Sequence, residues 1–497
     1  MKRISVLLFI FALAFSVRAQ APQPYLVADF AEKDLPAMLD LCRQSGIDAL
    51  VVRNPFSTFG HYEWNGTFAP EGNKSVKRMV KTAQDQGVTL GVMVQEEVIS
   101  TNDAYFAPKY FGQYQHSEAL TLFDEMGADD VDIALRRNDA VKNLSSLNLL
   151  RIDDELVSIG TMEFAGDLVL LHHCTRGMYG TRRVTHGTKA KVYRIWDTPD
   201  QQVIPTGELR EAVRQQLADR LEAVGITLAI QKGDPGQEFL DESIRVRQVE
   251  RWESEGVGNT IGWFVIRAAD KHRAATTVDD VQWMLSKAAA YNAGYGLLID
   301  PKAMKHPGAL SDLLAVIRQW NTLTRDGAFT AAHQEAMKDP YLDWNLEQRS
   351  EDSFLLYPLH FSRRFQCDLQ PVDTGLLQSE TWNWNAEEEG PFGLRLQVEG
   401  EVDVINPMVN TSRGLMMLAC TVKPGQKLAF DFKDTAWLLD ANGNKLETVA
   451  VEGLPELAKG DNEVNFFCEV DPEIEKRPVV KLRYITRDPA LVIHPHK

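Results

Sequence analysis

The sequence predicts an α/β protein, a (β/α)8-type (TIM-like) barrel of which six strands are recognisable, with an inserted β subdomain and a C-terminal all-β sandwich. Three observations predict it. Strand-like and helix-like segments alternate from Pro24 to about Asn321, which is typical of parallel βαβ units. Short strands separated by turns interrupt this alternation, and an all-β pattern follows from about Gln366. The expected domains are a signal peptide (1–19), the barrel (20–362), the insertion (113–194) and the sandwich (366–497).

The N-terminus predicts a secretory signal peptide. Lys2 and Arg3 precede the apolar run Ile4 to Phe15, and Val17-Arg18-Ala19 forms a small-x-small cleavage site. The run is too short to span a membrane comfortably. We therefore expect an exported protein, periplasmic or secreted, from a Gram-negative bacterium. Cleavage would remove three basic residues and no acidic one, so the net charge of −17 would become −20. This charge disfavours nucleic acid and anionic lipid as partners.

The elements of the barrel follow from hydrophobic periodicity. Glycines follow several helices, as helix C-termini prefer. The predicted strands lie near 25–30, 48–53, 88–95, 226–231, 259–267 and 293–300, and the helices near 32–45, 75–86, 206–224, 277–291 and 309–323. A complete barrel has eight strands. Either two more lie in less regular sequence, such as Ser243 to Gly256 or Ser353 to Phe361, or the barrel is incomplete.

The insertion carries a glycine-rich motif, Thr175-Arg176-Gly177-Met178-Tyr179-Gly180-Thr181, followed by His186-Gly187. We interpret it as a tight turn in which Arg176 binds nearby backbone carbonyls. Adjacent residues on a strand diverge, so His172-His173-Cys174 is expected to pack rather than to bind a metal. Cys42 falls on the apolar face of a helix, and a Cys420–Cys468 disulfide is compatible with the sequence.

Carboxylates follow several of the predicted parallel strands. Asp234 and Glu238 follow the fourth strand, Glu96 and Glu97 the third, and Asp300 the sixth. The C-terminal rim of a barrel is where such folds place reactive groups. Glycoside hydrolysis needs two carboxyl groups that face one cleft, one protonated and one ionised. Successive residues on a strand point to opposite faces, so at most one of Glu96 and Glu97 belongs to the site.

Other side chains at the same predicted rim could bind a sugar. Aromatic rings pack on the C–H faces of sugars, and cationic groups orient hydroxyl or carboxylate groups. The alternative for Trp263 is the barrel core, and for Trp64 packing on the insertion. The candidate substrate-binding residues are His61, Trp64, Lys232, Trp263, Arg267 and Asp300. The motifs of serine hydrolases, zinc proteases and nucleotide-binding proteins are missing from the sequence, and we expect no cofactor and no metal.

Several motifs resemble those of a large, poorly characterised group of bacterial glycosidase-like proteins. They are VMVQEEVISTND, IDDELVSIG, CTRGMYGT, TIGWFVI and TTVDDVQWMLSKAAAYNAGYGLLID. The resemblance implies a TIM-type barrel, a β insertion and a galactose-binding-like sandwich. Members of that group tend to end strand four with an aspartate–glycine–x–glutamate-like motif. Here the matching residues are Gly233-Asp234-Pro235-Gly236-Gln237-Glu238, and only a short segment separates them from Trp263.

The sequence therefore favours a glycoside-hydrolase-like protein that acts on a polysaccharide or oligosaccharide. Glu238 is the candidate acid, and Asp234 the nucleophile, base or charge stabiliser. Glu96 is the leading substitute. The alternative is a non-catalytic carbohydrate-binding or surface-assembly protein on a degenerate barrel.

Overall fold

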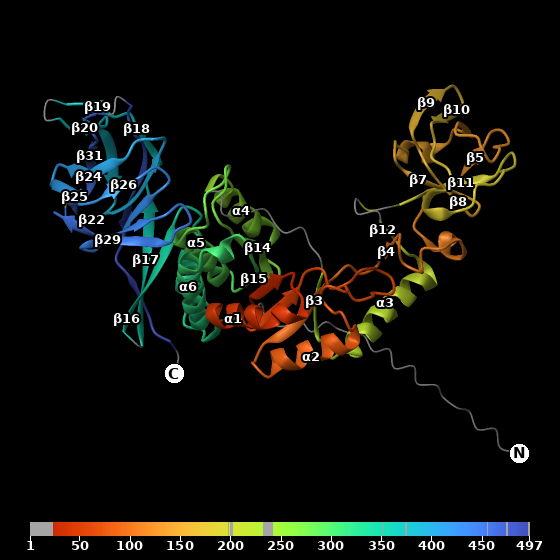
Figure 1. The fold of residues 1–497 in the computed structure, drawn as a ribbon, viewed down its shortest axis with the longest axis horizontal. Coiled ribbons are helices and arrows are strands. Elements are labelled where there is room, and N and C mark those ends of the chain that lie inside the picture. The colour runs from red at the N-terminus through yellow and green to blue at the C-terminus, as the bar shows by residue number, and fades with distance from the viewer. Residues whose placement is uncertain are drawn as a thin grey trace, which may run out of the picture. The chain divides into compact units, whose positions relative to one another are not determined.

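The computed structural model describes residues 23–196, 198, 202–231, 242–350, 352–372, 375–454, 456–473 and 476–495 (Figure 1). The expected signal peptide lies outside these residues. Contacts divide the chain into two compact units. Unit 1 comprises Met1–Val27, Leu39–Leu50 and Asp234–Lys497, and unit 2 comprises Ala28–Met38 and Val51–Gly233.

Six strands form the sheet that the βα alternation predicted. They are β1 (Tyr25–Ala28), β2 (Ala49–Val52), β3 (Thr89–Val94), β13 (Leu228–Gln231), β14 (Thr260–Ile266) and β15 (Gly294–Ile299). Their order is β13-β3-β2-β1-β15-β14. The pairs β13–β3, β1–β15 and β14–β15 are parallel. The parallel α/β pattern is confirmed, and among the described residues the sheet has two open edges rather than a closed eight-stranded barrel.

The helices follow the predicted periodicities closely. They are α1 (Leu35–Ser45), α2 (Asn73–Gln84), α3 (Gly207–Glu222), α4 (Glu242–Glu255), α5 (Val278–Ala290), α6 (Pro307–Arg325) and α7 (Ala331–Met337). Thr277 and Asp280 form a capping box that starts α5, since each side chain accepts from the other's backbone N–H. Cys42 is fully buried on α1, as its place on the apolar face predicted.

Neither segment proposed as an extra barrel strand joins the parallel sheet. Ser243–Gly256 supplies no extra strand, because residues 243–255 belong to helix α4. Val249 and Trp252, three positions apart, are both buried, which is a helical spacing. Ser353–Phe361 does form a strand, β17 (Ser353–Phe361), but β17 pairs antiparallel with β16 (Asp343–Ser350). In unit 1, antiparallel pairing thus begins at Asp343, upstream of the expected sandwich.

The antiparallel part of unit 1 has two halves around one core. The strands of the first half are, in order, β16, β17, β32 (Val479–Arg487), β23 (Gly393–Glu399), β27 (Lys427–Phe430) and β28 (Thr435–Leu439). Strand β29 (Lys445–Glu452) connects them to the second half. The strands of that half are, in order, β25 (Gly414–Leu418), β24 (Val404–Thr411), β31 (Gly460–Glu469), β20 (Leu377–Gln378) and β19 (Gln370–Pro371). Shorter strands flank this path: β18 (Phe365–Cys367), β21 (Trp382–Ala386), β22 (Gly390–Pro391), β26 (Thr421–Val422), β30 (Glu456–Leu457) and β33 (Leu491–Ile493). Leu396 on β23 and Phe466 on β31 share a single apolar cluster, as packed sheets require.

Helix α5 covers the free edge of this antiparallel sheet. β16 is the first strand in the order, so its outer N–H groups lack a strand partner. The Gln282 side chain on α5 accepts from the Leu346 backbone N–H at 2.9 Å and donates to Asn345 at 2.8 Å. It also accepts from the Trp320 indole at 3.2 Å. The buried Gln282 side chain therefore joins the helix to the edge strand through three hydrogen bonds.

The insertion in unit 2 forms an antiparallel sheet of seven strands. These are β5 (Leu120–Leu122), β6 (Ile133–Arg136), β7 (Leu149–Ile152), β8 (Glu155–Ser158), β9 (Thr161–Ala165), β10 (Leu168–His172) and β11 (Lys191–Ile195), in the order β8-β7-β11-β5-β6-β10-β9. A separate two-stranded pair joins β4 (Ile99–Ser100) to β12 (Gln202–Val203). The seven-stranded sheet has its own apolar core, which includes Leu135, Ile152 and Val192. Its strands all fall within or next to the predicted insertion.

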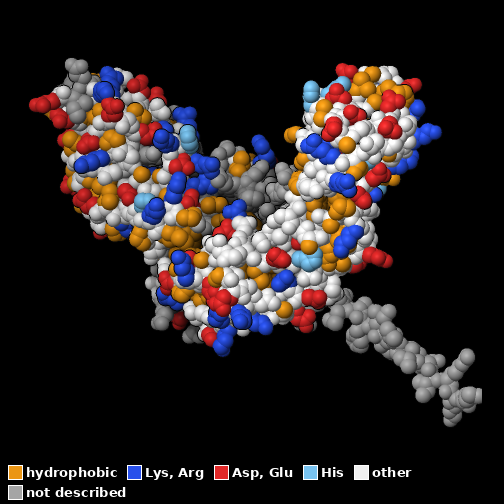
Figure 2. Space-filling model, turned by 45° about the vertical axis from the view of Figure 1, so that its right-hand side comes forward, with side chains coloured by type: hydrophobic (Ala, Val, Ile, Leu, Met, Phe, Trp, Pro, Cys, Tyr) orange, Lys and Arg blue, Asp and Glu red, His pale blue; other side chains and the backbone are white. Residues whose placement is uncertain are grey.

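The five cysteines are free, so the Cys420–Cys468 disulfide that the sequence allowed is not formed. Lys/Arg and Asp/Glu side chains are interspersed over the surface seen in Figure 2, so the acidic excess is spread out there. Within the described residues, no helix combines the length and apolar composition that a membrane crossing requires.

Helix α5 carries a buried lysine whose ammonium group binds main-chain carbonyls. Lys287 Nζ donates to the carbonyl of Met337 at 2.7 Å, to that of Asp339, and to that of Leu342 at 3.4 Å. These carbonyls lie at and beyond the C-terminus of α7, where helix carbonyls lack intrahelical partners. Burial lowers the pKa of Lys287 to about 8.

We expect Lys287→Met to lower the free energy of unfolding by about 2–3 kcal/mol, because buried carbonyls lose their donor. Between about pH 8 and the ordinary lysine pKa, folded Lys287 is neutral while the unfolded residue keeps its proton. This residue therefore makes stability rise with pH in that window. Urea unfolding on either side of pH 8 should show the rise in wild type and in the exposed control Lys305→Met, but not in Lys287→Met. An equal rise in all three would contradict the assignment.

Candidate functional site

The loops that leave the carboxyl ends of β1, β2 and β3 form a polar rim in unit 2. Asp29 follows β1 and Asn54 lies two residues beyond β2. The Asn54 backbone N–H donates to Asp29 Oδ1 at 2.9 Å, and its amide lies 3.0 and 2.9 Å from the two carboxylate oxygens. Asp29 is thus held in place by the neighbouring loop. Ligands of parallel α/β sheets bind outside the carboxyl ends of the strands, so this rim is the natural place for a site.

A histidine–aspartate pair joins the loops after β2 and β3. His61 Nδ1 lies 2.7 Å from Asp103 Oδ1, and the same carboxylate accepts from the backbone N–H groups of His61 at 2.9 Å and Tyr105 at 2.8 Å. The Asp103 side chain is 1% exposed and that of His61 is 32% exposed. The imidazole stacks on the Tyr105 ring at 4.0 Å. Because Nδ1 is engaged, Nε2 is the nitrogen left to act on a ligand.

Gly60 allows this pair to form. Its φ is +120°, and a Cβ there would lie 2.6 Å from Asp103 Oδ1. Only glycine tolerates both the backbone conformation and the close approach of the carboxylate. His61 was predicted from the sequence, whereas Asp103 was not, because it is 42 residues away and only the folded loops bring it close.

Tyr62 lies at the centre of the acidic rim. It is fully buried, and its hydroxyl donates to the carbonyl of Gln95 at 2.9 Å. Burial raises its pKa well above the usual value, and the nearby charges of Glu96, Asp103 and Glu97 raise it further. Its φ is +52° and that of Glu97 is +59°. Such left-handed conformations are costly for these residues and concentrate at functional sites.

Glu96 and Glu97 lie in the turn after β3 rather than on the strand, and they have different environments. Glu97 forms an ion pair with Arg214 and lies 3.8 Å from Arg210, both on α3. Glu96 is exposed, and its backbone N–H donates to Gln231 Oε1 at 3.4 Å. Within the described ranges, no side chain binds the Glu96 carboxylate. Glu97 therefore stabilises the loop against α3, and Glu96 is the carboxylate available to a ligand.

Two of the predicted sugar-binding aromatic residues are buried. Trp263 on β14 donates from its indole to the Tyr25 hydroxyl at 2.9 Å, so it belongs to the core of unit 1, as the alternative interpretation held. Trp64 stacks on Phe56 at 5.0 Å and donates to Asn73 Oδ1 at 2.6 Å. Their assignment as sugar platforms was wrong, because their ring faces pack against protein.

The other candidates lie in unit 1 or outside the described residues. Asp300 Oδ1 accepts from the Lys302 backbone N–H at 2.8 Å and so shapes the turn after β15. Arg267 is half-buried at the end of β14, where its backbone N–H donates to Thr276 Oγ1 at 3.0 Å. Lys232, Asp234 and Glu238 lie outside the described residues and stay predictions.

No protein-family model matches the chain, and no curated protein sequence matches it. Similar solved structures include a GH36 alpha-galactosidase from Geobacillus stearothermophilus, at 11% identity over 90% of this chain and 56% of that one, with a TM-score of 0.34. A maltogenic alpha-amylase from Thermotoga neapolitana has 9% identity over 88% and 99% of the two chains and a TM-score of 0.32.

A cyclic alpha-maltosyl-(1→6)-maltose hydrolase from Arthrobacter globiformis has 11% identity over 75% and 86% of the two chains and a TM-score of 0.30. These similar structures are carbohydrate-active hydrolases. The chain spans only about half the length of the alpha-galactosidase, 56%.

Proposed function

We propose that this chain is an exported glycoside-hydrolase-like protein that acts on a polysaccharide or oligosaccharide by two-carboxylate hydrolysis. The observation that carries the proposal is the acidic rim at the carboxyl ends of β1 and β3. There the exposed Glu96 carboxylate adjoins the buried Tyr62 and the ordered His61–Asp103 pair. Parallel α/β folds bind substrates at this edge, and glycoside hydrolysis needs carboxylates there.

The register of the sheet supports a contribution from the segment after β13. Gln231, the last residue of β13, lies opposite Val94, and its side chain accepts from the Glu96 backbone N–H. β13 therefore ends, at Gln231, beside the backbone of Glu96. In this proposal Glu238 is the general acid, Asp234 is the nucleophile or base, and Glu96 supplies the second carboxylate if either is displaced.

A non-catalytic carbohydrate-binding protein is the second candidate, and a specific observation favours it. Three acids of the rim stabilise loops: Asp29 is bound by Asn54, Glu97 by Arg214, and Asp103 by backbone N–H groups. A rim whose carboxylates mostly stabilise loops suits binding more than hydrolysis. The two candidates differ in whether bound glycan is cleaved.

Glu96→Gln and Glu97→Gln form a matched pair that tests the rim. On a glycan that the wild-type chain cleaves, Glu96→Gln should lower turnover by about 10²-fold, because it removes a charge from the site. Glu97→Gln should keep near wild-type turnover and lose at most about 1 kcal/mol of stability, because its partners are exposed arginines. Reducing-sugar release and melting temperatures measure both. If Glu97→Gln lost turnover and Glu96→Gln kept it, Glu97 rather than Glu96 would be the carboxylate that acts on the ligand.

A further inference from the structure

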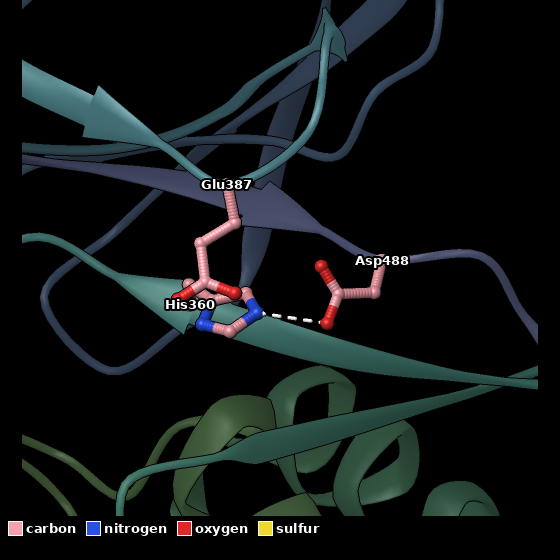
Figure 3. Close-up of side chains that lie close together, drawn as sticks. All are labelled: His360, Glu387 and Asp488. Atoms are coloured by element: carbon pink, nitrogen blue, oxygen red, sulfur yellow. Dashed lines mark hydrogen bonds and ion pairs between the residues drawn. The ribbon is translucent and has the colours of Figure 1, made fainter. Parts of the chain in front are cut away.

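Three side chains of the antiparallel sheet converge in unit 1, and none of them belongs to the proposed sugar site. They are His360 on β17, Glu387 just after β21 and Asp488 just after β32. Figure 3 shows the imidazole between the two carboxylates. One ligand atom from each lies within 4.8 Å of the other two. His360 Nε2 lies 3.0 Å from Asp488 Oδ2.

Strand register explains the convergence. β17 and β32 pair antiparallel, with Leu359 opposite Arg487, and the Asp488 backbone N–H donates to the Pro358 carbonyl at 3.1 Å. Side chains alternate between faces along a strand, so His360 and Asp488 are diagonal neighbours on one face. Arg487 lies on the opposite face, over the Tyr357 ring at 4.3 Å. The cation nearest in sequence to Asp488 is thus directed away from it.

The cluster has an excess of negative charge. Within the part of the chain that the structure describes, no lysine or arginine forms an ion pair with Glu387 or Asp488. His360 and Asp488 are only about a quarter exposed, at 24% and 29%. Two carboxylates beside one imidazole, with no cationic side chain paired to them, are stabilised by a bound cation more than by each other.

We propose that His360, Glu387 and Asp488 bind a divalent zinc ion. Imidazole nitrogen with carboxylate oxygens is a zinc donor set, whereas Ca²⁺ and Mg²⁺ take oxygen ligands almost alone. Ligand atoms of a tetrahedral zinc site are about 3.3 Å apart when each bond is about 2.0 Å, close to the His360–Asp488 separation. Zinc would replace the direct contact between His360 Nε2 and Asp488 Oδ2, and water would fill the fourth position. The ion would tie β17, β21 and β32 together.

The test uses the untagged full-length mature chain, treated with a chelator, dialysed and titrated with zinc chloride alone. Calorimetry should give one zinc ion per chain, and zinc should raise the melting temperature, because the ion binds only the folded state. His360→Gln and Asp488→Asn should each weaken binding at least about tenfold. Glu387 is exposed and lies just after β21, so Glu387→Gln should fold normally. It supplies a third variant with weakened zinc binding if the other two fail to fold.

His172→Gln is the matched control. The His172 imidazole also lies near two carboxylates, Asp132 at 3.5 Å from Nδ1 and Glu163 at 3.8 Å from Nε2. These acids face opposite ring nitrogens and cannot share one ion, so this variant should bind zinc as wild type does. The proposal is overturned if wild type binds no zinc, if zinc binding survives unchanged in His360→Gln and Glu387→Gln, or if Ca²⁺ competes with zinc at equal concentration.

Discussion

Arg176→Met is expected to destabilise the β subdomain by about 3–5 kcal/mol, because it leaves a buried carboxylate without its cation. Arg176 is 1% exposed and its partner Glu155 is fully buried. Nε and Nη2 of Arg176 donate to the two Glu155 oxygens at 2.6 and 2.8 Å. The Glu155 carboxylate also accepts from the Gly177 and Val184 backbone N–H groups and lies 3.0 Å from His186 Nε2.

The same guanidinium organises the glycine-rich motif. Its Nη1 donates to the carbonyls of Gly127 and Asp130, at 2.8 and 2.9 Å, and its Nη2 to that of Val184 at 2.9 Å. This confirms the interpretation of the motif as a turn held by Arg176. Breaking the pair should therefore loosen three loops at once. Arg182→Met, an exposed neighbour, serves as the control and should change stability by less than about 0.5 kcal/mol.

Hydrogen exchange on the full chain should localise the effect. Amides of 120–195 should lose protection in Arg176→Met and keep it in Arg182→Met, since the subdomain has its own core. Burial acts to raise the pKa of Glu155, but the Arg176 guanidinium and the other donors outweigh it and hold this pKa at about 2. Its contribution to stability is present above the ordinary carboxylate pKa and is lost as the pH falls toward 2. Unchanged protection in Arg176→Met would contradict this role.

The double variant Glu238→Gln, Asp234→Asn is expected to lower glycan turnover by several orders of magnitude while glycan binding persists. Each general acid or base contributes about 10²–10⁴-fold, and amides keep the shape of the carboxylates without their proton chemistry. Wild-type turnover should follow a bell-shaped pH profile, because one group must be protonated and the other ionised. Turnover and melting temperature are measured together. Wild-type turnover in the double variant would contradict the roles of Glu238 and Asp234 and leave Glu96 as the candidate catalytic carboxylate.

Local patterns in the sequence predicted most single elements of the fold. Helix α1 was found from the spacing of its apolar residues, including Cys42, and all six strands of the parallel sheet were found from apolar runs between turns. Helix α4 was missed, although Val249 and Trp252 have helical spacing, because a complete barrel left Ser243–Gly256 open as a further strand. The alternative of an incomplete barrel agrees with the two open edges of the described sheet.

Pairing partners and the candidate site depended on contacts distant in sequence. Ser353–Phe361 has the composition of a strand, but only the folded chain shows that it pairs with β16 and β32. Asp103 gave no periodic signal, and its approach to His61 requires the glycine at position 60. The burial of Trp64 and Trp263 likewise follows from tertiary packing, since a tryptophan near a strand end has the same sequence signal in a core and on a surface.

The most direct test of the account is whether the unmodified mature chain cleaves a glycan that it binds. A glycan array identifies bound carbohydrates, and a reducing-sugar assay on each of them detects new chain ends over time. We predict that at least one bound polysaccharide or oligosaccharide yields reducing ends at a rate proportional to protein concentration. Saturable binding with no new reducing ends at any pH would contradict hydrolysis and establish the binding protein instead.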